Sequence, residues 1–177
     1  SYETLLDDVD SLVQDVSKRH PGAPCFLYGH SLGGNIALNY GIRRGSGLAG
    51  VVATNPWLRL VNGPGLLKRL AASFMDPILP LLTFATADKE QDDGLDLDAL
   101  DQNGAGAGDG SRMSLFHSRV SLRMYVCVSR AASWALANAG QLRVPTLVVH
   151  GELDPVTDPR ASVEFAGRAN GACEVDI

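Results

Sequence analysis

The sequence predicts an α/β protein with a parallel sheet at its core and a helical cap inserted between two of the strands. Short apolar runs with strand character alternate with amphipathic stretches of helical period. A glycine-rich turn joins the first run directly to a helix, and a long stretch of different pattern separates the second run from the third. The 177 residues suffice for a single domain. We expect its core in residues 1–57 and 141–177, and the cap insertion in residues 58–140.

Residues 3–19 form the first predicted helix. Apolar side chains recur there at spacings of three and four, at Leu5, Leu6, Val9, Leu12, Val13 and Val16. Acidic residues come early and basic ones late, which suits the helix dipole. Pro21 and Gly22 end the helix, because a residue before proline avoids helical geometry. We expect His20 beside them to be exposed to solvent.

The turn at residues 29–34, Gly-His-Ser-Leu-Gly-Gly, lies between a predicted strand at 25–28 and a helix that runs to about residue 44. In this context the pattern G-x-S-x-G predicts a nucleophile elbow. Such a turn lifts Ser31 to the end of the sheet, with its hydroxyl facing a cleft.

Each neighbour of Ser31 in this turn has an expected part. A side chain at Gly29 or Gly33 would collide with nearby backbone, which explains both glycines. The Leu32 amide lies at a helix N-terminus, where an unpaired N–H and the dipole favour a developing oxyanion. His30 is expected to pack as a polar residue beside the cleft.

Three further runs complete the predicted sheet. Residues 48–54 form a second strand that ends at Asn55, and the strand–helix–strand unit predicts a right-handed crossover between parallel strands. Residues 145–151, Pro-Thr-Leu-Val-Val-His-Gly, contain a third strand. A helix then starts near residue 158 and runs to about 169, and a fourth strand begins at 173.

The predicted cap contains amphipathic and low-complexity stretches. Residues 66–79 have a helical apolar pattern that prolines interrupt, and residues 111–139 look helical again. Between them lie an acidic run at 88–101, expected to be a solvated loop, and a glycine-rich stretch at 103–110. The apolar face of the cap would either line a substrate cleft or pack on the sheet.

Ser31 needs a base to remove its proton and a carboxylate to orient that base. In open parallel sheets such groups gather at the carboxyl ends of the strands. Asp154 follows the third strand by a few residues and is the preferred acid. Two other acids compete for this role: Glu152 lies one residue off the strand, and Asp158 is better explained as a helix cap. No metal or organic cofactor is required.

Residues 29–34 and 145–159, together with Leu-Phe-His-Ser-Arg-Val-Ser at 115–121, resemble the monoacylglycerol lipase and serine aminopeptidase branch of the α/β-hydrolases. The resemblance covers nearly the whole chain. It implies Ser31 as nucleophile, Asp154 as triad acid and the Leu32 N–H as half of the oxyanion hole. It also implies hydrolysis of carboxylic esters of acylglycerol or lysophospholipid type through an acyl-enzyme.

The sequence departs from this family in its histidines. The family order is serine, acid, histidine, yet no histidine follows Asp154. His20, His117 and His150 are poor candidates for the base. The strands that precede the elbow strand in the family, and the loop that gives the second oxyanion donor, are also lacking. We therefore expect a central fragment of a hydrolase with negligible activity, an unpaired apolar sheet edge and low stability.

Charge and cysteine content limit the other functions. The net charge of -5 and the lack of a basic cluster argue against nucleic-acid binding. Three cysteines without a C-x-x-C pair suggest free thiols in a reducing compartment. We expect a cytoplasmic protein, or one that touches a membrane peripherally through its cap. The alternative function is a non-catalytic module that binds a lipid or a partner.

Overall fold

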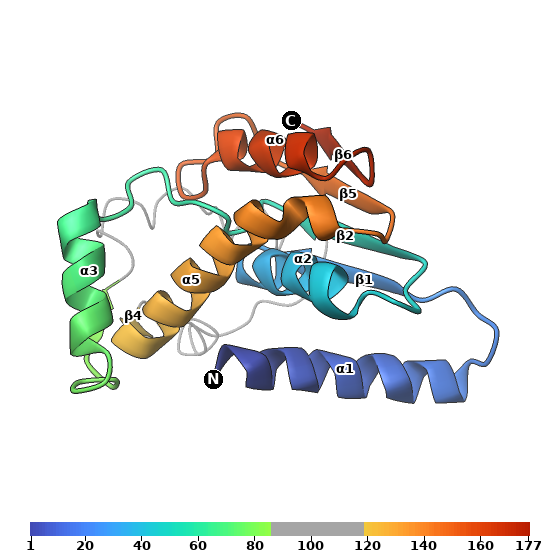
Figure 1. Cartoon of the computed structure of the whole chain (residues 1–177), viewed down its shortest axis with the longest axis horizontal. Helices are drawn as coiled ribbons and strands as arrows, with labels where there is room; N and C mark the ends of the chain where they lie inside the picture. Colours follow the sequence, from blue (N-terminus) through green and yellow to red (C-terminus); the bar gives the residue numbers. More distant parts are fainter. Residues whose placement is uncertain (86–118) are drawn as a thin grey trace, which may run out of the picture.

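The computed structural model describes residues 1–85 and 119–177 (Figure 1). The acidic run at 88–101, the glycine-rich stretch at 103–110 and His117 lie outside the described residues. Two sheets are present, of which the larger has four strands in the order β1-β2-β5-β6.

The four-stranded sheet is parallel throughout, as the sequence predicts. Its strands are β1 (Phe26–His30), β2 (Gly50–Thr54), β5 (Thr146–Val149) and β6 (Cys173–Asp176). Leu27 pairs with Val51, and Val52 pairs with Leu147, so the three segments that frame the candidate site share one register. Because the strands are parallel, the turns after β1, β2 and β5 all lie at the same edge of the sheet.

The helices α2 (Leu32–Arg44), α5 (Leu122–Asn138) and α6 (Pro159–Arg168) lie together on one side of the sheet in Figure 1, and α1 (Tyr2–Arg19) packs against α2 and α5. Alternate strand residues point toward them, and Val51, Ala53 and Val148 are buried there. These residues pack with Leu38 of α2 and Phe165 of α6 in the main core.

The opposite face of this sheet is largely open. Phe26 and Tyr28 of β1 are 63% and 65% exposed, and Leu147 and Val149 of β5 are 38% and 36% exposed. Parallel sheets are normally covered on both faces. The open surface is therefore wider than the single apolar edge expected from the sequence.

Helix α1 is buried only at its amino end. Leu6 is fully buried and the Tyr2 hydroxyl donates to Asn35 Oδ1 at 2.5 Å. By contrast Leu12 is 59% exposed and Val16 is 37% exposed. The predicted apolar stripe of α1 is present. Its carboxyl-terminal half is exposed, because α1 extends beyond the edge of the sheet (Figure 1).

The insertion differs in part from the expected run of helices. The helix α3 (Leu66–Met75) ends before Pro77, as the prolines predict. Residues 119–121, expected to be helical, instead form β4 (Arg119–Ser121), which pairs antiparallel with β3 (Thr83–Ala85). Helix α5 then starts behind Ser121, whose hydroxyl accepts a hydrogen bond from the Met124 amide at 3.2 Å. Helix α5 lies within the predicted cap but packs against α2 in the core.

Candidate active site

Ser31 lies in a strained turn between β1 and α2. Its φ of 51° and ψ of -113° fall in a region that side-chain-bearing residues rarely adopt. Two backbone hydrogen bonds hold the turn: the Ser31 amide donates to the Thr54 carbonyl at 2.9 Å, and the Trp57 amide donates to the Ser31 carbonyl at 3.0 Å. The geometry is that expected of a nucleophile elbow.

The two glycines of the motif are not equivalent. A Cβ added to Gly29 would lie 2.2 Å from the Gly33 carbonyl oxygen, so this position requires glycine. A Cβ at Gly33 meets nothing within 4 Å, so the expected collision there is wrong. Gly33 already belongs to the first turn of α2, and a Cβ there would enter open space. The second close approach in this turn is at Gly34, where an added Cβ would lie 3.0 Å from the Pro56 Cα.

The neighbours of Ser31 differ in how well they match expectation. Leu32 is the first residue of α2, so its amide has no acceptor within the helix and is available at the turn. His30 is exposed rather than packed, because it lies on the open face of β1 with Phe26 and Tyr28, whereas Leu27 and Gly29 face the other way. Its Nδ1 lies 2.9 Å from Thr54 Oγ1.

Asp154 follows β5 and lies at the same edge of the sheet as Ser31. Its Oδ1 accepts hydrogen bonds from the Val156 and Thr157 amides at 2.7 and 2.8 Å. Its Oδ2 accepts from the Thr157 hydroxyl at 2.8 Å and from Asn55 Nδ2 at 2.5 Å. The side chain is only 9% exposed.

These contacts keep Asp154 ionised. Burial acts to raise the pKa of Asp154, but the hydrogen bonds from Thr157, Val156 and Asn55 outweigh it and hold that pKa below its ordinary value. A buried, charged carboxylate at this edge can orient an imidazole and stabilise its cation.

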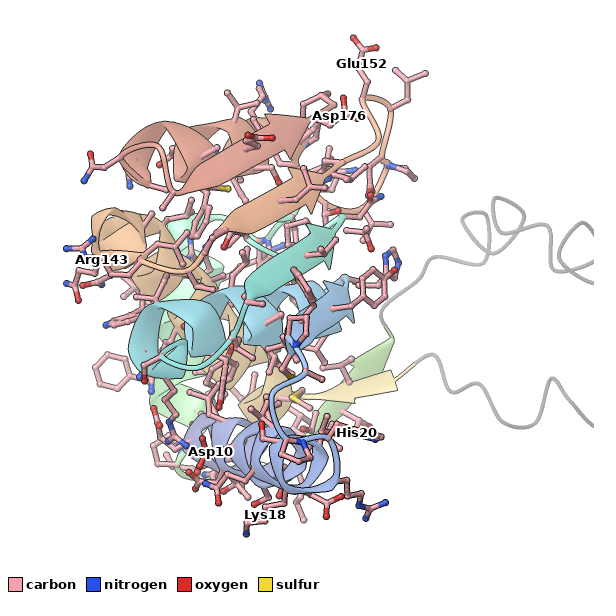
Figure 2. All side chains as sticks on the ribbon, turned by 90° about the vertical axis from the view of Figure 1, so that its right-hand side faces the viewer. Asp10, Lys18, His20, Arg143, Glu152 and Asp176 are labelled. Atoms are coloured by element: carbon pink, nitrogen blue, oxygen red, sulfur yellow. The ribbon has the colours of Figure 1, made fainter. Side chains whose placement is uncertain are left out.

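The two competing acids have other surroundings. Glu152 is exposed, and Figure 2 shows it projecting outward from the turn that follows β5. Asp158 caps α6 by accepting a hydrogen bond from the Arg160 amide at 3.1 Å. It also pairs with the Arg59 guanidinium at 3.5 Å. Asp158 is therefore a helix cap, as expected.

The histidines of the described residues do not offer a base to Ser31. His150 is buried, with Nδ1 2.7 Å from the Ser162 hydroxyl and Nε2 3.2 Å from the Thr157 carbonyl, so both ring nitrogens have partners. His20 ends α1 on the side where β1 begins, whereas Ser31 follows the other end of that strand. His30 is bound to Thr54.

Asn55 is the site residue that the sequence analysis missed. It has a φ of 44°, directly after β2, and its side chain reaches the acid from the middle strand. Its amide donates to the Val149 carbonyl at 2.9 Å. An asparagine that directly follows a strand is a signal for such a turn, because Asn tolerates this backbone region better than other residues.

A second contact joins the segment after β2 to the acid's loop. Leu60 forms an isolated antiparallel bridge with Thr157, and the Asp158 amide donates to the Arg59 carbonyl at 2.9 Å. Residues 59–61 thus hold the loop of Asp154 through backbone contacts with residues 156–158. Within the two described ranges, no group of three or more His, Cys, Asp or Glu could hold a metal ion. No helix there is both long and apolar enough to span a bilayer.

Comparison with known proteins shows which family and fold the chain resembles. Residues 1–176 match the family described as serine aminopeptidase, S33. The chain is 36% identical over 89 residues to human monoglyceride lipase, covering 49% of this chain and 29% of that protein. It is 27% identical over 167 residues to a phospholipase of Bacillus subtilis, covering 93% of this chain and 61% of the relative.

The fold is also that of a solved lipase. The monoacylglycerol lipase of Paleococcus ferrophilus superposes with a TM-score of 0.79 at 23% identity, covering 99% of this chain and 64% of that one. The chain therefore spans less than two thirds of the length of each of these three proteins.

Proposed function

The chain belongs to the serine aminopeptidase S33 family and has the α/β-hydrolase fold, and from this we propose that it carries the nucleophile and the acid of a serine ester hydrolase. The observation that supports this most directly is that a strained Ser31 and an Asp154 with a lowered pKa both follow the carboxyl ends of strands in one parallel sheet. A strained turn persists only where the surrounding structure enforces it, and such turns cluster at reactive sites.

In the proposed reaction the Ser31 hydroxyl attacks the carbonyl carbon of an ester while a histidine removes its proton. The Leu32 N–H stabilises the negative charge on the carbonyl oxygen of the tetrahedral intermediate. The alcohol leaves with the proton from the imidazolium, and Ser31 becomes an acyl ester. The same histidine then takes a proton from water, the hydroxyl attacks the acyl carbon, and the carboxylic acid leaves as the histidine returns the proton to the Ser31 oxygen. Asp154 holds the histidine in one tautomer and stabilises its charged form throughout.

We propose an acylglycerol or lysophospholipid as the substrate class. The names of the human and Bacillus subtilis relatives, a monoglyceride lipase and a phospholipase, support esters of glycerol.

The insertion carries apolar side chains that would favour contact with a lipid surface: Leu67 is 82% exposed and Phe74 is 81% exposed. Lys68 and Arg69 lie beside them on α3. Sedimentation with lipid vesicles, compared between the chain and Phe74→Ser, tests this contact.

We further propose that the 177 residues by themselves have negligible esterase activity. His20, His30 and His150 have the positions and partners described above, and none is placed to deprotonate Ser31. Loss of the base costs serine hydrolases on the order of 10⁴–10⁶ in rate. His117, the fourth histidine, lies outside the described residues and precedes Asp154 in the sequence, whereas the base of this family follows the acid.

Labelling with a fluorophosphonate probe tests both proposals. The protein as made by its own cells should react, and peptide mapping should place the adduct on Ser31. The recombinant 177-residue chain and its Ser31→Ala variant should react equally slowly. An adduct on another serine, or no adduct in the cellular protein, would contradict the hydrolase. Rapid labelling of the isolated chain would contradict its inactivity.

The second candidate is a non-catalytic module that binds a lipid or a partner. The side-chain contacts of His30 and His150 favour it, because both histidines nearest the site serve structural roles. The labelling experiment separates the two functions, since a binding module leaves Ser31 unmodified in the cellular protein.

A further inference from the structure

One short segment holds both members of the candidate pair. Residues 54–57 run from the last residue of the inner strand β2 into the turn after it, and their backbone holds Ser31 from two sides, through the Thr54 carbonyl and the Trp57 amide. Between these two residues, the Asn55 side chain reaches in the other direction and donates to Asp154 Oδ2 at 2.5 Å. The elbow and the acid are thus joined through a four-residue stretch.

The four donors to the Asp154 carboxylate are not equivalent. Three of them, the two amides and the hydroxyl of Val156 and Thr157, belong to the same turn as the acid and move with it. Among the described residues, Asn55 is the donor that comes from another strand. Its bond therefore ties the carboxylate directly to the segment that holds Ser31, whereas the other three tie it to its own loop.

We propose that Asn55 is a positioning residue, whose side-chain amide sets the orientation of Asp154 and its spacing from the Ser31 elbow. The inference deepens the proposed hydrolase function and rests on it for its catalytic meaning. Asn55 does not touch the reacting atoms; it acts through the carboxylate that orients the base.

The orientation of the Asn55 amide is fixed at both ends. Its Nδ2 faces the Asp154 carboxylate, and its Oδ1 lies 3.4 Å from the Gly151 amide, which can donate only to an oxygen. The backbone amide of Asn55 is tied to the Val149 carbonyl. Three contacts along β5 and its turn thus keep this side chain from rotating away.

Two substitutions separate the amide from the backbone. Asn55→Asp keeps the shape but places a second carboxylate against Asp154, where like charges raise the pKa of the pair. Asn55→Gly keeps the left-handed backbone and removes the donor. Asn170→Asp is the matched control, because Asn170 also has a positive φ of 53° but is exposed at the end of α6.

The experiment follows the carboxyl carbon of Asp154 by NMR as the pH is lowered, in the folded chain and in each variant. The titratable neighbour is His150, whose Nε2 lies 3.6 Å from Oδ2, so its ring signals are followed in the same samples. We expect the pKa of Asp154 to rise by about 1 to 2 pH units in Asn55→Gly, from the loss of one hydrogen bond to a charged group. Asn55→Asp should raise it further, and Asn170→Asp should leave it unchanged.

The pKa of Asp154 is a readout that a merely structural asparagine would not move. If both Asn55 variants fold and leave that pKa at its original value, the inference is wrong. In the cellular protein, the pH at which Ser31 labelling falls by half on the acid side should rise in Asn55→Gly. If the pKa of Asp154 shifts while Ser31 is unreactive in every form, the proposed function fails and the contact between Asn55 and Asp154 stands.

Discussion

Ser31 and Asp154 are held by different kinds of constraint. The Ser31 turn is fixed through the main chain, by hydrogen bonds to Thr54 and Trp57 and by the close passage of Gly29 against Gly33. A backbone of this kind costs of order 1–3 kcal/mol, which the surrounding packing offsets. Asp154 is fixed through its side chain, by four hydrogen-bond donors.

Alanine substitutions at the two glycines of the elbow, Gly29 and Gly33, should have different effects on the free energy of unfolding. Gly29→Ala should lower the free energy of unfolding by at least ~2 kcal/mol, because its Cβ would overlap the Gly33 carbonyl. Gly33→Ala should leave it unchanged or raise it by up to about 1 kcal/mol, since the Cβ enters open space in a helix. Urea unfolding followed by circular dichroism measures both. Equal effects at the two positions would contradict the turn geometry.

Asp154 should make stability depend on pH in the acid range. Its folded-state pKa lies below the ordinary value of 3.8, so the ionised carboxylate stabilises the fold fully above that pH. The stabilisation is lost as the pH falls through the folded-state pKa. Asp154→Asn should therefore be less stable than the parent chain at pH 7, and the difference should shrink below about pH 4. Unfolding midpoints measured across this range would show parallel curves if the carboxylate were unpaired.

At the scale of elements, the start of α6 is determined by its local sequence and also takes part in tertiary contacts. Pro159 occupies the first turn and Asp158 the N-cap, the arrangement favoured at a helix start. The same aspartate is held to the loop after β2, because its amide donates to the Arg59 carbonyl and its carboxylate pairs with the Arg59 guanidinium. The N-cap residue Asp158 thus also holds the loop that carries Asp154.

A pair of substitutions separates the two roles of Asp158. Asp158→Ala should lower the free energy of unfolding by about 1–2 kcal/mol, because α6 loses its capping acceptor. Asp158→Asn should cost less, since asparagine caps as well as aspartate and the pairs with Arg59 and Arg160 involve exposed guanidinium groups. Thermal unfolding of the two variants measures the difference. A larger loss in Asp158→Asn would show that the ion pairs dominate.

At the scale of the whole molecule, helices cover one face of the four-stranded sheet and the other face is exposed. Helices α2 and α6 pack directly on one face of the sheet and α1 and α5 pack on α2, while apolar residues of β1 and β5 are exposed on the other face. Within the described residues no strand pairs with the outer side of β1, which also exposes the side chains of Phe26 and Tyr28. Exposed apolar edges of this kind favour association between copies of a chain. A broad, weakly cooperative thermal transition is expected for the same reason.

Self-association of the isolated chain should depend on this face. Phe26→Lys should reduce concentration-dependent association and the binding of a hydrophobic dye, because it places a charge on the exposed edge strand. Leu153→Lys is the matched control, since Leu153 is 90% exposed but lies in a loop. Sedimentation velocity at several concentrations measures association. An equal effect of both substitutions would rule out the open face as its cause.

By itself the sequence determined the parallel strand–helix order, the elbow at Ser31 and the cap at Asp158, because these depend on local periodicity, glycine and proline positions and capping oxygens. The pattern could not distinguish the two glycines around Ser31, since only three-dimensional proximity shows that Gly29 meets backbone and Gly33 does not. It also assigned residues 119–121 to a helix, where pairing with β3 overrides the helical period.

The tertiary structure alone decided what surrounds the acid. The hydrogen bond from Asn55 joins residues 99 positions apart, and no spacing rule relates such residues. The burial of His150 and the openness of the Phe26 face likewise depend on which elements lie against each other. Local sequence determines the path of the backbone over a few residues. The pKa and the orientation of a side chain depend instead on all the groups that folding brings close to it.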